Sequence, residues 1–382
     1  MTGALIKASQ QFPVVSLTGP RQSGKTTLVK KIFPNMVYVS LENPDTLEYA
    51  LTDPRAFLRQ AKDGMIIDEA QRAPELFSYI QGIVDEAGKN GMYVLTGSQN
   101  FLLLANISQS LAGRVAIFKL LPFSVEEYGS AFKIPSIEEL LLKGMYPRIH
   151  TQKLEFGSWF ESYITTYLER DVRNLKNIGN LYTFQKFLKL CAGRSGQILN
   201  YSSLANDCGI SHNTARSWIS ILEASFIVSI LPPYYENFNK RLVKSPKLYF
   251  LDTGLLCHLL GIHNVQHYSV HPLRGAVFET FVFSELLKIF LHRGLKKELY
   301  YWRDKTGHEI DFVIPLGEKK LALEVKAGKT VHSDFFRNLN FWKKLGGGSN
   351  CFILYNGTLE QNRQAGHILP VFKGLELLAL LL

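Results

Sequence analysis

The segment that most constrains the fold of this chain is an eight-residue stretch near its start. Residues 19–26 read Gly-Pro-Arg-Gln-Ser-Gly-Lys-Thr and fit Gly-x-x-x-x-Gly-Lys-[Ser/Thr], the pattern of a phosphate-binding loop. The apolar, β-branched run 14–18 before it predicts a buried strand, and the helical spacing of apolar residues in 27–33 predicts a helix after it. A strand, a glycine-bearing loop and a helix N-terminus together form a cradle for phosphate groups. The alternative is an ordinary glycine-rich turn before a helix.

The side chains of this loop predict how a nucleotide and its metal ion would be held. Lys25 is expected to reach the β- and γ-phosphates, and the Thr26 hydroxyl is expected to bind Mg²⁺. The glycines let the backbone curl until several N–H groups point inward. The nucleotide-contacting residues predicted from the sequence are Gly19, Pro20, Arg21, Gln22, Ser23, Gly24, Lys25, Thr26, Thr27, Asp68 and Ser98.

Two acidic residues follow an apolar run at 65–67, which is the pattern of a Walker-B strand, and a run at 36–41 predicts another strand. A strand buried on both faces is continuously apolar, and ligands bind at the carboxyl edge of open α/β sheets. Asp68 is therefore expected to hold Mg²⁺, directly or through water. Glu69 is expected to act as the general base on the attacking water. The alternative is a solvated strand end.

Two further segments carry candidate residues for the same site. The apolar run 92–96 predicts a strand whose tip holds Ser98 and Gln99, either of which could contact the γ-phosphate or order the water. Capping of a helix by Ser98 or Asn100 is the alternative. Arg114, just before the next predicted strand, is a candidate finger on a neighbouring subunit's nucleotide, or else the partner of a carboxylate.

The charge of the chain restricts its partners. Its 43 Lys and Arg residues outnumber its 33 Asp and Glu residues, which gives a net charge of +10. A strongly basic protein favours a polyanionic partner, with nucleic acid first, although a basic surface also serves solubility. The four cysteines lie far apart without a Cys-x-x-Cys pair, which is typical of reduced thiols in the cytosol. No signal peptide or membrane span is recognised, so we expect a cytoplasmic protein with no membrane association.

The segment 201–222 has the form of a helix-turn-helix. Gly209 permits the tight turn between two amphipathic helices, and Ser211 is expected to cap the second one. The polar side chains predicted to point outward from the second helix, which suit the reading of a DNA groove, are His212, Asn213, Arg216 and Ser217. The extended run 227–231 could form the wing of a winged helix. Such domains also serve as lids or protein docks, so contact with DNA and contact with protein both stay open.

The region after residue 246 predicts a further α/β domain. Apolar residues at helical spacing predict a helix over 274–290, and alternation with β-branched residues predicts strands at 298–303, 307–314 and 320–326. The last two strands are expected to form a hairpin. Pro315 could shorten it, because proline cannot donate a ladder hydrogen bond.

The predicted hairpin brings acidic residues and one lysine together. Glu324 and Lys326 lie two residues apart and so share one face of their strand, and Asp311 is expected opposite them. Two carboxylates can hold Mg²⁺ while the lysine stabilises developing charge or orients the attacking water. We therefore predict Asp311, Glu324 and Lys326 as catalytic residues, and Asp311, Glu324 and Glu279 as metal ligands. A surface ion pair between Glu324 and Lys326 is the alternative.

Four of these segments together resemble the P-loop ATPases of the AAA+ superfamily: residues 19–26, 66–69, 96–98 and 110–114. More narrowly, the chain is similar to the group of that superfamily whose ATPase domain is followed by a poorly characterised C-terminal region. That similarity extends to 144–147 and 163–172, and in the group a helical segment corresponding to 154–175 links the two halves. The resemblance implies a parallel-sheet ATPase core and ATP rather than GTP, and the chain has no Asn-Lys-x-Asp guanine motif.

The C-terminal order of acid, strand, Asp, hairpin and Glu-x-Lys is similar to the PD-(D/E)-x-K nuclease fold of restriction-type endonucleases. The two resemblances imply an α/β P-loop NTPase with a parallel central sheet, then a winged helix-turn-helix-like domain, then an α/β restriction-endonuclease-like domain. We expect their bounds at 1–150, 151–245 and 246–382.

The function predicted from the sequence is Mg²⁺-dependent ATP hydrolysis by Lys25, Glu69 and Arg114, acting on or near DNA, with a C-terminal nuclease-like domain that cleaves nucleic acid. The alternative is a nucleotide-gated switch or scaffold whose C-terminal domains only bind partners. ATP and Mg²⁺ are the expected cofactors, and DNA is the expected macromolecular partner. A finger role for Arg114 would imply a homo-oligomer.

Overall fold

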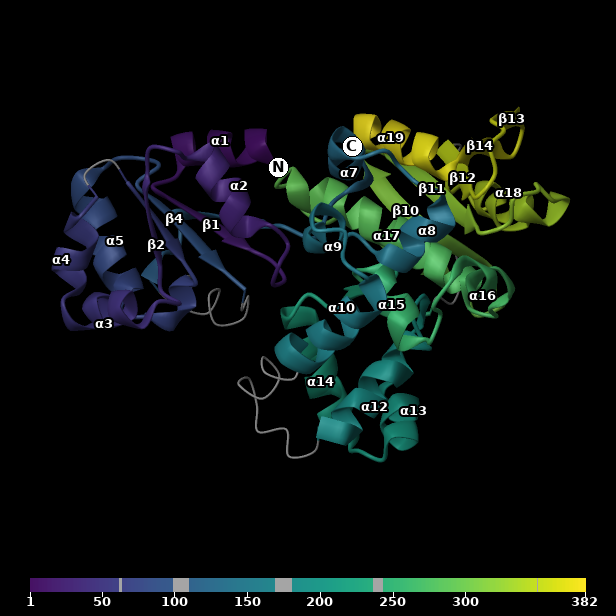
Figure 1. The fold of residues 1–382 in the computed structure, drawn as a ribbon. Helices are drawn as coiled ribbons and strands as arrows, with labels where there is room; N and C mark the ends of the chain where they lie inside the picture. The colour runs from purple at the N-terminus through teal and green to yellow at the C-terminus, as the bar shows by residue number, and fades with distance from the viewer. Residues whose placement is uncertain (62–63, 99–109, 169–180, 236–242, 349) are drawn as a thin grey trace. The chain divides into compact units, whose positions relative to one another are not determined.

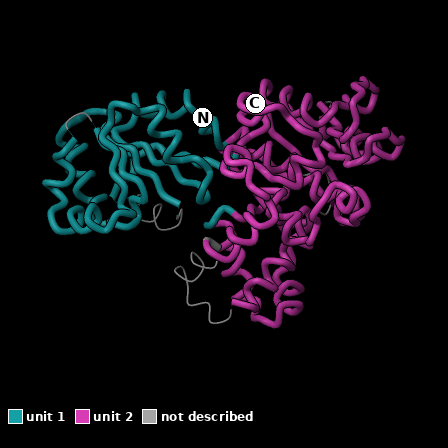
Figure 2. Tube along the Cα trace, viewed as in Figure 1, with its two compact units in different colours: residues 1–122, 224–226, 291–295 teal, residues 123–223, 227–290, 296–382 magenta. Residues whose placement is uncertain are grey.

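The computed structural model describes the whole chain except residues 62–63, 99–109, 169–180, 236–242 and 349. The chain divides into two compact units, shown in different colours in Figure 2. Unit 1 comprises residues 1–122, 224–226 and 291–295, and unit 2 comprises residues 123–223, 227–290 and 296–382. The middle and C-terminal regions thus fall in one unit, and the three domain bounds expected from the sequence stay a prediction.

Unit 1 is built on a parallel β-sheet. Its strands are β1 (Val14–Thr18), β2 (Val37–Ser40), β3 (Met65–Asp68), β4 (Tyr93–Gly97) and β5 (Val115–Lys119). They lie in the order β2-β3-β4-β1-β5, and every pairing between neighbours is parallel. The parallel central sheet predicted from the sequence is confirmed.

Helices cover both faces of this sheet (Figure 1). They are α1 (Thr2–Gln11), α2 (Lys25–Ile32), α3 (Pro44–Thr52), α4 (Pro54–Arg59) and α5 (Leu76–Ala87), with a short 3-10 turn η1 (Ala70–Arg72). Successive strand residues enter opposite cores: Val14 and Ile67 pack with α3, α4 and α5, whereas Val15 and Ile66 pack with α1 and α2. Because both faces are buried, the strands read as continuous apolar runs.

Unit 2 contains most of the helices and two sheets. Its helical elements are α7 (Val125–Ala131), α8 (Ile137–Lys143), α9 (Pro147–Thr151), α10 (Phe156–Tyr163), η2 (Ile164–Leu168), α12 (Leu181–Ala192), α13 (Tyr201–Cys208), α14 (His212–Ala224), α15 (Thr253–Leu259), α16 (Val265–Val270), α17 (Arg274–His292), η3 (Ser333–Phe336), α18 (Arg337–Lys344) and α19 (Val371–Leu381). The linking helix expected over 154–175 corresponds to α10 and η2, and its charged residues Glu169, Arg170, Asp171 and Arg173 lie outside the described residues. None of the helices in the described part of the chain combines the length and the apolar character that crossing a bilayer requires.

The predicted helix pair α13 and α14 is present, with the expected local chemistry. Ser211 Oγ accepts a hydrogen bond from the Thr214 N–H at 3.0 Å and so caps α14. Trp218 and Leu222 bury the inner face of α14, while Arg216 is exposed. The extended run expected at 227–231 forms β7 (Val228–Leu231), which joins β6 (Gln197–Ile198) and β8 (Lys247–Phe250) in a sheet of order β6-β8-β7.

The larger sheet of unit 2 has six strands in the order β13-β14-β12-β11-β10-β9. They are β9 (Tyr300–Arg303), β10 (Glu309–Leu316), β11 (Lys319–Lys326), β12 (Asn350–Tyr355), β13 (Gln361–Arg363) and β14 (Gly366–Pro370). The pairs β11–β12 and β12–β14 are parallel and the others antiparallel. Trp342 of α18 shares a core with Ile353, and α19 packs against the next residue, Leu354, so these two helices cover opposite faces.

Pro315, which the sequence marked as a residue that could shorten the hairpin, does not interrupt it. The β10–β11 register continues through the pair Pro315 and Lys320 to the pair Leu316 and Lys319. On the other side of β10, the described pairing with β9 ends at Val313. Proline is tolerated where a strand has a free edge, because its missing N–H removes no ladder hydrogen bond there.

Candidate functional site

The loop 19–26 joins β1 to α2 in the geometry expected of a phosphate cradle. Gly24 has φ 94°, a left-handed conformation that costs residues with a side chain more than glycine. A Cβ atom on Gly19 would lie 2.1 Å from the carbonyl oxygen of Leu120, so only glycine fits this approach. Helix α2 begins at Lys25 without a side-chain cap, which leaves its first-turn N–H groups to an anion.

Buried polar atoms in the loop fit a phosphate ligand. Lys25 is 7% exposed, and its Nζ donates to the carbonyl oxygens of Gly19 at 2.9 Å and of Pro20 at 2.8 Å. Ser23 is 4% exposed, and its Oγ has no hydrogen-bond partner among the described residues. A buried hydroxyl without a partner is costly, and a phosphate oxygen would remove that cost. The residues present therefore fit the nucleotide that the sequence predicts.

Asp68 lies at the carboxyl end of β3 and accepts hydrogen bonds from three neighbouring elements. Its Oδ2 accepts from the hydroxyls of Thr26 and Tyr38, both at 2.8 Å. Its Oδ1 accepts from the hydroxyl of Thr96 on β4. Burial and the Asp68 carboxylate raise the pKa of Tyr38, so the phenol stays a donor. A hydroxyl and a carboxylate in direct contact are ligands that suit Mg²⁺, as predicted for Thr26 and Asp68.

Glu69 follows Asp68 with a left-handed backbone, at φ 55° and ψ 42°. Its Oε2 accepts from Ser98 Oγ at 3.0 Å and from Gln71 Nε2 at 2.5 Å. Gln71 is 8% exposed, and its Oε1 has no hydrogen-bond partner among the described residues. Ser98 thus orients Glu69, a role that differs from both alternatives considered from the sequence, while Gln99 and Asn100 lie outside the described residues.

Arg114 pairs with a carboxylate of its own chain. Its Nε lies 2.5 Å from Asp85 Oδ1 and its Nη2 lies 2.8 Å from Asp85 Oδ2, a two-pronged contact. These hydrogen bonds lower the pKa of Asp85. The second of the two roles considered from the sequence is therefore present, and contact with a neighbour's nucleotide stays a prediction.

The other predicted loop residues lie around the same cradle. The Arg21 guanidinium is 3.8 Å from the Glu42 carboxylate. Thr27, in the first turn of α2, is exposed. Sequence reasoning gave no role to Tyr38, Thr96 or Gln71. Thr96 belongs to the segment 96–98 that carries the resemblance, whereas Tyr38, within the predicted strand 36–41, and Gln71, three residues after Asp68, belong to no motif.

The three residues predicted as catalytic in the C-terminal region lie together on β10 and β11. The register pairs Phe312 with Leu323, which brings Asp311 beside Glu324 as expected. The Lys326 Nζ lies 2.5 Å from Glu324 Oε2, and Asp311 Oδ2 accepts from the N–H of Val325 at 2.8 Å. Burial, and next the charge of Asp311, raise the pKa of Glu324 to about 8. The buried carboxylates therefore favour a nearby cation.

Glu279 of α17 lies near this cluster but contacts other residues. Its Oε1 accepts from the Lys247 ammonium at 3.0 Å and from the hydroxyl of Tyr249. Burial raises the pKa of Glu279 to about 7, against the opposite effect of Lys247. Among the described residues, no group of three or more His, Cys, Asp or Glu side chains is arranged to hold a metal ion. The predicted set of Glu279, Asp311 and Glu324 thus forms no three-carboxylate site here.

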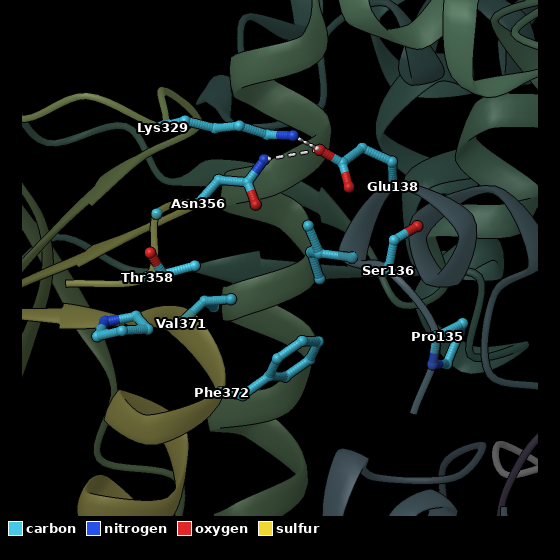
Figure 3. A pocket seen from close by; sticks show the side chains of 11 residues that line it. Pro135, Ser136, Glu138, Lys329, Asn356, Thr358, Val371 and Phe372 are labelled. Carbon is cyan, nitrogen blue, oxygen red and sulfur yellow. Dashed lines mark hydrogen bonds and ion pairs between the residues drawn. The ribbon is translucent and has the colours of Figure 1, made fainter. Parts of the chain in front are cut away.

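Unit 2 also contains a cavity of about 510 Å³, shown in Figure 3. It lies between the start of α8 and the loop and helix that follow β12 and β14. Glu138 accepts hydrogen bonds from Asn356 at 3.1 Å and lies 3.0 Å from the Lys329 ammonium. Phe372 and Val371 supply an apolar wall. None of the residues predicted from the sequence lines this cavity.

Comparison with known protein families supports the N-terminal assignment. Residues 11–129 match an AAA domain, residues 134–266 match a domain of unknown function (DUF8612) and residues 274–373 match a domain of unknown function (DUF4143). The N-terminal part is therefore a P-loop ATPase-like domain of the AAA type, a class that binds and hydrolyses ATP.

Relatives align along most of the chain. An uncharacterized protein of Mycobacterium tuberculosis is 34% identical over 331 residues, which cover 85% of this chain and 73% of the relative. An uncharacterized protein of Methanocaldococcus jannaschii is 27% identical over 378 residues, covering 83% of this chain and 76% of the relative. Among solved structures, a Walker-type ATPase of Pyrococcus abyssi has 14% identity and a TM-score of 0.46 over 68% of this chain and 94% of that chain. The chain belongs to the same family as the mycobacterial protein, and within it carries an AAA domain of the P-loop ATPase type followed by domains of unknown function.

Proposed function

We propose that the protein binds ATP with Mg²⁺ at the loop 19–26 and hydrolyses it. The observation that carries the proposal is the 2.8 Å hydrogen bond between Thr26 Oγ1 and Asp68 Oδ2. It joins the phosphate loop to the carboxyl end of β3, so the two expected metal ligands already lie together. A bound Mg²⁺ would neutralise charge on the phosphate oxygens during the reaction.

The residues of the chain have separate tasks in this reaction. The Lys25 ammonium exchanges the carbonyl oxygens of Gly19 and Pro20 for phosphate oxygens, which keeps the buried charge compensated. The N–H groups at the start of α2 hold the phosphates in place. Glu69 takes a proton from the attacking water, and Ser98 and Gln71 fix the position of its carboxylate.

The test is Mg²⁺-dependent ATP turnover by the full-length chain and three variants. Glu69→Gln is expected to bind ATP normally and to lose about 10²–10⁴-fold in turnover, which is the usual contribution of a general base. Lys25→Ala is expected to lose both ATP binding and turnover. Lys31→Ala is the matched control, because Lys31 is exposed on the same helix. A pure preparation that binds no ATP would overturn the proposal.

We further propose that the C-terminal region is a PD-(D/E)-x-K nuclease-like domain that acts on DNA. In this proposal Asp311 and Glu324 hold a divalent cation, Lys326 stabilises the developing charge, and the preceding helix-turn-helix with β7 acts as a winged helix. The antiparallel β10–β11 pair supports it, because Asp311 lies next to Glu324 and Glu324 contacts Lys326. The alternative is a nucleotide-gated switch whose C-terminal part only binds partners.

Incubation with single- and double-stranded DNA and Mn²⁺ or Mg²⁺ separates these two functions. Cleavage that disappears in Asp311→Ala and persists in Asp334→Ala would support the nuclease, because Asp334 is an exposed aspartate of the same unit. No cleavage of either substrate would support the switch.

A further inference from the structure

Four carboxylates, those of Glu279, Glu309, Asp311 and Glu324, form an acidic cluster in unit 2. Lys247 places a buried ammonium beside this cluster, and no sequence motif predicts this lysine. It lies on β8 and is 2% exposed. Its Nζ is 3.0 Å from Glu279 Oε1 and 2.5 Å from Glu309 Oε1, so one ammonium bridges two carboxylates. Charges buried this deeply persist in proteins only when they are paired. The Lys247 ammonium is therefore a structural component of the acidic cluster.

These contacts engage Oε1 of Glu279 and both carboxylate oxygens of Glu309. Glu279 Oε1 accepts both from Lys247 and from the Tyr249 hydroxyl two residues further along β8. Glu309 presents Oε1 to Lys247 and Oε2 to the Arg303 guanidinium, at 3.0 Å. A divalent cation placed between these two carboxylates would be repelled by the ammonium that lies between them.

The other side of the cluster has a different arrangement. Asp311 and Glu324 are neighbours on paired strands. An ammonium also contacts Glu324, since Lys326 Nζ lies 2.5 Å from its Oε2, but the Lys326 side chain is 27% exposed whereas that of Lys247 is 3% exposed. Mg²⁺ and Mn²⁺ are commonly bound by one or two carboxylates with water and substrate oxygens filling the other positions. Two carboxylates here suffice for one such ion.

We propose that the cluster binds a single divalent cation, between Asp311 and Glu324, and that the Lys247 ammonium takes the place of a second cation by pairing with both Glu279 and Glu309. Glu279 is then a partner of Lys247 and not a metal ligand, which narrows the ligand set expected from the sequence. This inference rests on the proposed C-terminal cation site and adds its stoichiometry and the role of Lys247.

The first test counts Mn²⁺ ions bound by the full-length chain without nucleotide, by titration calorimetry and by the electron paramagnetic resonance signal of free Mn²⁺. The double variant Asp311→Asn/Glu324→Gln is expected to bind one Mn²⁺ ion fewer than the unchanged chain. Glu279→Gln is expected to keep the affinity of that ion within about twofold. If the Asp311→Asn/Glu324→Gln variant loses no ion, the proposed C-terminal cation site is wrong. If that variant loses two ions, or if Glu279→Gln binds the ion at least tenfold more weakly, the cation site stands and only the present inference is wrong.

The second test removes the bridging ammonium. Lys247→Met is expected to bind one additional Mn²⁺ ion, and Glu279→Gln in that background is expected to abolish the gain. Lys288→Met is the matched control, because Lys288 is 1% exposed and pairs with Glu285 at 2.7 Å on the same helix as Glu279. A folded Lys247→Met that still binds one ion would contradict the role of Lys247. If Lys247→Met fails to fold, the Glu279→Gln result of the first test still decides whether Glu279 is a metal ligand.

Discussion

Gln71 lies two residues beyond Glu69 and holds its carboxylate at 2.5 Å, yet its own amide oxygen is buried without a hydrogen-bond partner in the described part of the chain. A buried acceptor of this kind suits a water molecule, which donates hydrogen bonds. In the proposed ATP hydrolysis, Gln71 would fix Glu69 with its nitrogen, and its oxygen would be an acceptor for the attacking water.

We expect Gln71→Ala to lower the kcat of ATP hydrolysis about tenfold, because a lost hydrogen bond of about 1.5 kcal/mol corresponds to that factor. The KM for ATP is expected to change less than about twofold, since Gln71 lies outside the phosphate loop. Steady-state kinetics of the variant measure both numbers. Gln60→Ala, an exposed glutamine of the same unit, is the control. A raised KM with unchanged kcat would instead assign Gln71 to nucleotide binding.

Arg114 allows a sharp distinction between an ion pair and a catalytic finger. A finger contributes about 10³–10⁵ to kcat, whereas an exposed ion pair contributes little to any property. Because Arg114 makes a two-pronged contact with Asp85, we expect Arg114→Ala and Asp85→Ala to have the same small effect on turnover, less than about threefold. A loss of three orders of magnitude in Arg114→Ala alone would restore the finger. Turnover is to be measured over a range of protein concentrations, since a finger in trans requires assembly.

At the residue scale, the sequence predicted the side chains that belong to fixed spacings and missed those that do not. Lys25, Thr26 and Asp68 lie where the phosphate-loop and Walker-B patterns placed them. Tyr38 on β2 contacts Asp68 on β3, and Lys247 on β8 contacts Glu279 on α17. The two residues of each pair are close in space but about 30 residues apart in the sequence. Such contacts depend on the strand order, which no local pattern of residues specifies.

Helix α15 shows how one buried side chain stabilises two elements. Asp252 is 4% exposed and caps α15 by accepting from the Leu255 N–H at 2.9 Å, while its other oxygen accepts from the Met145 N–H at 2.7 Å. The segment 144–147, singled out in the sequence by resemblance alone, is thus held to the start of α15. A substitution at Asp252 would leave two backbone donors unpaired.

We expect Asp252→Ala to lower the free energy of unfolding by about 2–4 kcal/mol, the sum of a lost helix cap and a buried unpaired N–H group. Urea denaturation followed by circular dichroism measures the change. Asn264→Ala is the control, because Asn264 is an exposed cap of α16 with one backbone partner, and its loss is expected to cost about 1 kcal/mol. Equal effects of the two substitutions would contradict the role given to the Met145 contact.

At the element scale, strong local signals were enough for some elements and not for others. The α13–α14 pair was predictable because Gly209 and the Ser211 cap mark its turn. The hairpin of β10 and β11 was predicted, but the effect of Pro315 was not, because the edge at which it lies depends on where β9 ends. The short strand β8 was missed, because its residues Lys247–Phe250 belong to no motif and its pairing with β6 and β7 depends on the tertiary fold.

Across the whole molecule, the predicted bound at 245 and 246 separates strands that pair. β7 ends at Leu231 and β8 begins at Lys247, yet the two are antiparallel neighbours with Val228 opposite Phe250. Strand β6 also pairs with β8 across this bound, with Gln197 opposite Leu248. Local patterns along a chain do not reveal such long-range pairing. The middle and C-terminal regions fall in one compact unit, and the three domain bounds stay a prediction.

The excess of positive charge is a property of the whole chain, and its test is the salt dependence of DNA binding. Each phosphate that a basic side chain neutralises adds about 0.9 to the slope of log K against log salt concentration. If the exposed face of α14 contacts DNA, Arg216→Ala is expected to reduce that slope by about one unit. Fluorescence anisotropy of a labelled duplex, titrated at several salt concentrations, measures the slope.

The control is Arg59→Ala, which removes an exposed arginine of unit 1 and so lowers the net charge of +10 by the same amount as Arg216→Ala. Because both variants lose one charge, an equal change in both slopes would assign the binding to overall charge, whereas a change confined to Arg216→Ala would assign it to α14.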